Sequence, residues 1–134
     1  MMTGNNEERR GSKRAFFTLE EGISANVKLV GHEEEESSRV TLLSISIGGL
    51  SFLVARHQLA EVKLGDRLKI TDIQTPYPLG TIDEIEGDIR YVIDYDQHAC
   101  IAIGVEFTDI LQLHRKKIFE YVNDRLSRLG LQKS

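Results

Sequence analysis

A cluster of positive side chains lies close to the N-terminus. Arg9, Arg10, Lys13 and Arg14 occur within six residues that contain no acid. Arg10 and Arg14 are four residues apart, which places both side chains on one side of either a helical turn or an extended segment. A guanidinium can donate two hydrogen bonds at once to a phosphate, or to O6 and N7 of guanine. The segment is therefore a candidate site for a nucleotide or another small anion.

A second polar motif is formed by Ser44 and Ser46, which are followed by Gly48 and Gly49. Residues 40–47 read as a strand, in which successive side chains point to opposite sides. The alternation predicts that both serines point outward on the face of Leu42, and that the other face holds Leu43, Ile45 and Ile47. The two glycines predict a tight hairpin turn with positive φ angles. Hydroxyl groups beside an accessible backbone can bind a ring or a phosphate.

The overall charge limits the class of ligand. The chain has 21 acidic and 17 basic residues, which gives a net charge of −4. Proteins that bind long nucleic acids normally present a broad basic surface, so no nucleic-acid polymer is expected as a partner. A short basic segment on an acidic domain suits a small anion better.

Length and composition indicate one domain. A chain of 134 residues that is 40% hydrophobic fits a single modest core, and residues 1–8 read as a polar tail. No apolar run approaches the roughly 20 residues needed to span a bilayer, and no secretory signal is visible. A cytoplasmic protein without membrane contact is expected. The single Cys100 predicts a packing role, and the four scattered histidines predict no metal site.

From residue 22 onward the pattern is that of a β protein. Period-two stretches bounded by turn residues predict six strands, at about 22–31, 40–47, 50–54, 68–73, 79–93 and 99–107. Gly87 marks a bulge within the fifth of these strands. Short antiparallel strands without helical crossovers predict a small barrel or a two-sheet sandwich.

The C-terminal part has a different period. Apolar side chains recur three and four residues apart between residues 110 and 129, which predicts an amphipathic helix that packs on the sheet. Asp109 and Gln112 resemble an N-terminal capping box, and Gly130 lies where a C-terminal cap is expected. The apolar positions are Leu111, Ile118, Tyr121, Val122, Leu126 and Leu129.

The order of these motifs resembles the PilZ family of cyclic di-GMP receptors. That family carries Arg-x-x-x-Arg before the first barrel strand and Asp/Asn-x-Ser-x-x-Gly at the end of the second. The motifs fall here on Arg10 and Arg14, then on Ser44, Ser46 and Gly49. The resemblance extends from residue 9 to the C-terminal helix. The chain departs from the pattern at Ser44, which lacks the reach and charge of the usual Asp or Asn.

The resemblance implies a mainly β fold, namely a six-stranded antiparallel β-barrel with a C-terminal amphipathic helix and a mobile N-terminal arginine loop. The domain would span residues 9–134, with the ligand-binding loop at 9–21, the barrel at 22–107 and the helix at 109–130.

The resemblance also implies a non-catalytic receptor that binds cyclic di-GMP as a ligand and needs no cofactor. The arginine loop would close over the ligand and signal to an unidentified effector protein. Arg39 and Arg90 match family positions only loosely and are expected to be solvated. The implied ligand-binding residues are Arg9, Arg10, Arg14, Ser44, Ser46 and Gly49.

Alternatives stay open. Ser44 is the reason to keep as an alternative a PilZ-like adaptor that binds no nucleotide and acts through protein contacts, whereas the arginine pair, Ser46 and Gly49 favour binding. Phe16 and Phe17 beside the basic segment are also compatible with single-stranded nucleic acid, but their position before a strand favours anchoring in the core. An enzyme is not expected, because the acidic pairs lie in turns and no histidine or nucleophile has a suggestive spacing. Monomer and homodimer are equally compatible with the sequence.

Overall fold

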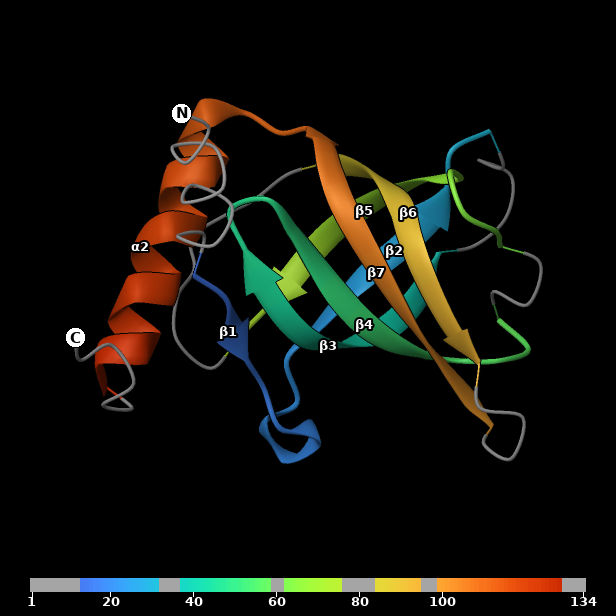
Figure 1. Ribbon diagram of the computed structural model, residues 1–134, viewed down its shortest axis with the longest axis horizontal. Coiled ribbons are helices and arrows are strands. Elements are labelled where there is room, and N and C mark those ends of the chain that lie inside the picture. Colours follow the sequence, from blue (N-terminus) through green and yellow to red (C-terminus); the bar gives the residue numbers. More distant parts are fainter. Residues whose placement is uncertain (1–12, 32–36, 59–61, 76–83, 95–98, 129–134) are drawn as a thin grey trace, which may run out of the picture.

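The computed structural model describes residues 13–31, 37–58, 62–75, 84–94 and 99–128. A short strand and a 3-10 helix come first, six longer strands follow, and one α-helix ends the described chain (Figure 1). In chain order the elements are β1 (Ala15–Phe16), η1 (Leu19–Glu21), β2 (Ser24–Leu29), β3 (Ser38–Ser46), β4 (Gly49–Ala55), β5 (Arg67–Gln74), β6 (Ile85–Asp94), β7 (Cys100–Asp109) and α2 (Gln112–Arg128).

The strands form a closed antiparallel barrel. Their order in the sheet is β1-β3-β2-β5-β6-β7-β4, and an additional pairing of β3 with β4 joins the two sides of the sheet. Strands β2 to β7 therefore make a six-stranded barrel, as predicted, and β1 is an extra strand. β1 pairs with the end of β3 that β2 does not reach, with Ala15 opposite Ile45 and Phe16 opposite Ser44. This short strand was not predicted.

The barrel interior holds the hydrophobic core. Alternate positions of β2 illustrate the pattern, because Ala25 and Val27 are buried while their neighbours are partly exposed. The bulge predicted at Gly87 is confirmed by a register shift between Glu86 and Gly87 in the pairing of β6 with β7. The most buried large side chains are Phe52, Ile23, Leu42, Ile45, Leu50, Leu68, Ile70, Ile85, Ile89, Ile103, Ile118 and Val27.

A register shift in β3 corrects the predicted division of its faces. The pairing with β4 shifts between Leu42 and Ser44, which is the signature of a bulge. Leu42 and Ile45 are consequently both part of the core, each 1% exposed. The prediction that Leu42 shares a face with Ser44 and Ser46 is therefore wrong, because strict alternation fails where an extra residue is inserted.

Helix α2 lies against β1 and β3, as Figure 1 shows. Its buried face consists of His114, Ile118, Tyr121 and Val122, which confirms the predicted packing on the barrel. The predicted capping box is wrong, because Asp109 is the last residue of β7 and the helix begins only at Gln112. Leu111 is 59% exposed and does not belong to the buried stripe. The predicted cap at Gly130 lies outside the described residues.

Arg125 fastens the far end of α2 to the segment around β1. Its guanidinium lies 4.8 Å from the ring centre of Phe17, pairs with Glu21 at 2.7 Å and donates to the carbonyl of Phe16 at 3.0 Å. Phe17 is buried, as predicted for a core anchor, whereas Phe16 is 68% exposed. The helix is thus bound to the stretch of chain that directly follows Arg14. Within the described ranges, no helix is long and apolar enough to cross a membrane.

Candidate functional site

An open pocket of about 510 Å³ lies on the outside of the barrel, where β1 meets the β3–β4 hairpin and strands β6 and β7. Arg14 reaches this pocket because it directly precedes β1, which is held against the end of β3. The pocket is lined by Arg14, Phe16, Ser44, Ser46, Gly48, Gly49, Leu50, Ser51, Arg90, Tyr91, Gly104, Val105 and Glu106. Four of the predicted site residues, namely Arg14, Ser44, Ser46 and Gly49, are therefore brought together.

The guanidinium of Arg14 rests on serine hydroxyls. Its Nη1 donates to Oγ of Ser44 at 2.8 Å and its Nη2 donates to Oγ of Ser46 at 3.2 Å. Ser44 shares a further hydrogen bond of 2.7 Å with Ser51. Ser44 and Ser46 are each 2% exposed, so the prediction of outward serines open to solvent needs correction. They lie outside the core but beneath Arg14, and they hold the arginine in place.

The electrostatic setting of Arg14 is unusual for an arginine. Burial lowers the pKa of Arg14 below its ordinary value, and the nearby phenol of Tyr91 has a smaller opposing effect. Among the described residues no carboxylate lies within ion-pair distance of Arg14. Glu106 also lines the pocket, but it pairs with Arg90. A half-buried cation that contacts only neutral hydroxyls leaves a strong demand for an anion.

Gly49 is needed for close approach of two strands. A Cβ atom at Gly49 would lie 2.1 Å from the carbonyl oxygen of Val105 in β7, which is backbone and cannot move aside easily. The prediction of positive φ angles at Gly48 and Gly49 is wrong, because the glycines with positive φ in the described chain are Gly22, Gly31 and Gly65. The role of Gly49 is to bring the backbone of β4 against β7 at the wall of the pocket.

Sequence reasoning missed the aromatic wall. Tyr91 in β6 lies directly opposite Gly104 in β7, and a Cβ at Gly104 would lie 2.0 Å from the ring. The ring therefore packs on bare backbone while the residue remains 44% exposed. An aromatic residue beside a cross-strand glycine is a recognisable signal, but only after the strand register is known. Ser51 was missed for the same reason, whereas Phe16 was expected to anchor in the core and instead lies exposed at the pocket.

Arg90 and Arg39, which match family positions only loosely, have different surroundings in the structure. Arg90 was expected to be solvated, and its side chain is indeed 63% exposed, but it also lines the pocket and pairs with Glu106. Arg39 is 37% exposed and far from being merely solvated, because a polar network surrounds it. Arg9 and Arg10 lie outside the described residues, so their predicted contacts with a ligand stay predictions.

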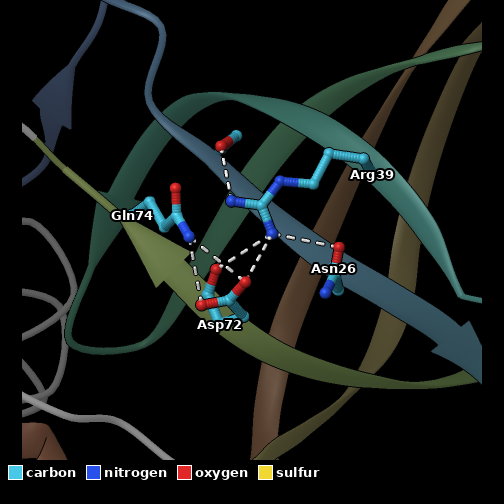
Figure 2. A network of polar contacts seen from close by, with 5 residues as sticks. Asn26, Arg39, Asp72 and Gln74 are labelled. Carbon is cyan, nitrogen blue, oxygen red and sulfur yellow. Dashed lines mark hydrogen bonds and ion pairs between the residues drawn. The ribbon is translucent and has the colours of Figure 1, made fainter.

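The Arg39 network, which Figure 2 shows from close by, belongs to the other end of β3. The guanidinium donates to Asn26 at 3.0 Å, to the Asp72 carboxylate at 3.0 Å and to Ser24 at 2.7 Å. Gln74 donates to the same carboxylate at 3.3 Å. Asp72 has a φ of 53° where β5 bulges against β2, and this left-handed conformation is one that Asp tolerates. The network is self-sufficient, because the cation is matched by a carboxylate and neutral acceptors.

Comparisons with known proteins agree with this geometry. The family model for the PilZ domain matches residues 8–124. No curated protein matches the chain. The fold is similar to that of the PilZ domain of YcgR from Escherichia coli, solved with c-di-GMP, at 15% identity and a TM-score of 0.63, covering 94% of this chain and 99% of that one.

Two longer proteins contain the same fold. The Bacillus subtilis inhibitor of motility MotI/DgrA has 19% identity and a TM-score of 0.68, with 93% of this chain covered. The MrkH–c-di-GMP complex of K. pneumonia has 16% identity and a TM-score of 0.67, with 91% covered. The chain spans 54% of the length of each of these proteins. At such identities the likeness concerns the fold.

Proposed function

Because the chain belongs to the PilZ domain family, we propose that it is a non-catalytic receptor that binds cyclic di-GMP (c-di-GMP) in the Arg14 pocket. The observation that carries the proposal is the half-buried guanidinium of Arg14, which rests on hydroxyls and has no carboxylate partner among the described residues. Such a cation gains most from an anionic ligand that is brought into the same pocket.

The chemical groups of cyclic di-GMP match the side chains that line the Arg14 pocket. Cyclic di-GMP carries phosphates and guanine bases on one ring, and a guanidinium can bind either group through paired hydrogen bonds. We assign the direct contact to Arg14, with Ser44 and Ser46 as positioning residues that keep its guanidinium in place. The exposed face of Tyr91 is suited to stack on a base. Two proteins of similar fold, the YcgR PilZ domain and MrkH, were solved with c-di-GMP, which supports the same ligand here.

The finer part of the proposal concerns the N-terminal segment. Arg9 and Arg10 precede Arg14 in the chain, and we propose that they add contacts to the ligand as this segment closes over it. Arg125 connects the carbonyl of Phe16 and the ring of Phe17 to α2. Ordering of the arginine segment would therefore change the contacts that Arg125 of α2 makes. The helix can in this way pass a signal to an effector protein.

Isothermal titration of the whole chain with c-di-GMP tests the proposal. We expect saturable binding with a Kd on the order of micromolar or tighter. Guanosine monophosphate, which offers a single phosphate and base, should bind much more weakly. Absence of heat up to about millimolar c-di-GMP would overturn the receptor function and leave the nucleotide-free adaptor in its place.

A further inference from the structure

A second, acidic pocket of about 290 Å³ lies where α2 begins, beside the ends of β6 and β7. It is lined by Glu84, Glu86, Asp109, Leu111 and His114. None of these residues lines the Arg14 pocket. The acidic pocket is therefore a separate place in the fold, and the proposed c-di-GMP site does not account for it.

The histidine of this pocket lacks a partner. His114 is 3% exposed, and its buried Nδ1 has no hydrogen-bond partner. A buried polar atom without a partner usually costs on the order of 1–3 kcal/mol. A neutral imidazole has one nitrogen that accepts a hydrogen bond and one that donates. The unpaired nitrogen marks a polar side chain at the wall of this pocket that the described residues leave unsatisfied.

The carboxylates of the pocket are incompletely paired. Glu86 and Asp109 lie directly opposite each other on β6 and β7, a like-charge arrangement that disfavours the strand pair. Arg67 is 3.9 Å from Glu86, but its Nε donates to Asp88 at 2.9 Å. That hydrogen bond and the charges of Asp88, Glu86 and Asp109 raise the pKa of Arg67. One guanidinium is thus shared among several carboxylates.

The remaining ion pairs leave Asp109 exposed to a new cation. Lys69 pairs with Glu84 at 3.3 Å. In the described ranges Asp109 has no ion pair within 4.0 Å. An additional positive group between Glu86 and Asp109 would relieve their repulsion, because it would face both carboxylates at short range.

The size and shape of the pocket favour an organic cation. A volume of about 290 Å³ is several times the roughly 30 Å³ of one water molecule. The described residues contain no group of three His, Cys, Asp or Glu arranged to hold a metal ion. Leu111, which is 59% exposed, offers an apolar edge on which an alkyl chain can pack. A forked guanidinium on an alkyl stem matches these walls.

We propose that this acidic pocket receives the guanidinium of an arginine side chain presented by a partner protein. The stem of that arginine packs on Leu111, and its guanidinium lies between Glu86 and Asp109, beside the buried His114. Because α2 begins at this pocket, a partner docked here contacts the same helix that Arg125 ties to the Arg14 segment.

A matched pair of peptides tests the site by NMR titration of the whole chain. Acetyl-Gly-Arg-Gly-amide carries the guanidinium, and acetyl-Gly-citrulline-Gly-amide has the same shape without the charge. We expect saturable shifts at His114 and Asp109 with the arginine peptide, with a Kd on the order of millimolar. Equal shifts with the citrulline peptide would overturn the proposal. Binding of free agmatine without binding of the arginine peptide would overturn the partner side chain as the occupant.

Paired variants locate the contact. Asp109→Asn should weaken binding of the arginine peptide by roughly fivefold, because it removes the carboxylate with no partner of its own. Asp124→Asn on the exposed side of α2 is the control and should leave the Kd unchanged. Arg14→Gln should also leave it unchanged, since the two pockets are separate. Equal effects of Asp109→Asn and Asp124→Asn would show nonspecific attraction to an acidic surface and overturn the site.

Discussion

The two ends of strand β3 each hold a guanidinium, and the comparison of the two separates a structural arginine from one suited to a ligand. Near its N-terminal end, Arg39 faces the Asp72 carboxylate at 3.0 Å together with neutral acceptors (Figure 2). Near its C-terminal end, Ser44 and Ser46 hold Arg14 by hydroxyl groups alone. The positive charge of Arg39 is therefore balanced by a carboxylate, whereas that of Arg14 is not.

The difference lies in the neighbours that each strand register supplies. A bulge between β2 and β5 brings Asp72 and its left-handed backbone towards Arg39. At the other end, the shift between Leu42 and Ser44 turns the serines away from the core and under Arg14. At Arg39 the carboxylate of the protein balances the charge and stabilises the fold. At Arg14 no carboxylate does so, and an anionic ligand can gain binding energy from the charge.

The largest expected effect concerns the backbone wall of the Arg14 pocket. Gly49→Ala should destabilise the protein by about 3 kcal/mol, because the new Cβ meets the carbonyl of Val105 at 2.1 Å. Gly48→Ala is the matched control, since nothing lies within 4 Å of its Cβ position, and it should change stability by less than about 0.5 kcal/mol. Urea unfolding of both variants measures the difference. Equal stabilities would show that β4 and β7 are not in close contact here.

The stacking wall is expected to give the next largest effect. Tyr91→Leu keeps an apolar side chain over Gly104 but removes the aromatic face, so c-di-GMP should bind roughly tenfold more weakly. Ile93→Ala changes another exposed residue of β6 that does not line the pocket, and should leave the affinity as it is. Titration calorimetry compares the two. Unchanged affinity in Tyr91→Leu would show that Tyr91 does not stack on the ligand.

At the Arg39 end, the prediction concerns stability instead of binding. Asp72→Asn keeps a residue that tolerates the left-handed conformation but removes the charge that faces Arg39. We expect a loss of about 1 kcal/mol or less that shrinks in high salt, because the pair is partly exposed. Urea unfolding at two salt concentrations measures this effect. If c-di-GMP affinity fell as well, the two ends of β3 would not be independent.

The smallest effect compares one serine from each end. Ser44→Ala removes an acceptor that positions Arg14 and should weaken c-di-GMP binding by about threefold. Ser24→Ala removes an acceptor of Arg39 and should leave the affinity unchanged. The same ligand titration serves for both variants. A larger loss in Ser24→Ala would contradict the assignment of Arg39 to structure.

The sequence predicted the barrel well because its strands alternate in polarity over whole elements. The site was only partly predictable. Local spacing pointed to the arginines and serines, the PilZ resemblance joined Arg14, Ser44, Ser46 and Gly49 into one site, and the pocket lining includes all four. Tyr91 could not be assigned, because its place beside Gly104 depends on the register of β6 and β7. The burial of the serines and the reason for Gly49 also depend on contacts between distant segments, which local periodicity does not contain.

The most direct test of the account is the c-di-GMP affinity of Arg14→Gln compared with that of Arg39→Gln. Both changes remove one positive charge near β3, Arg39 from the strand itself and Arg14 from beside its C-terminal end. We predict that Arg14→Gln weakens binding by roughly 100-fold while Arg39→Gln changes it by less than about twofold. Thermal unfolding should confirm that both variants are folded. Equal affinities in the two variants would contradict the claim that the uncompensated Arg14 is the ligand-binding cation.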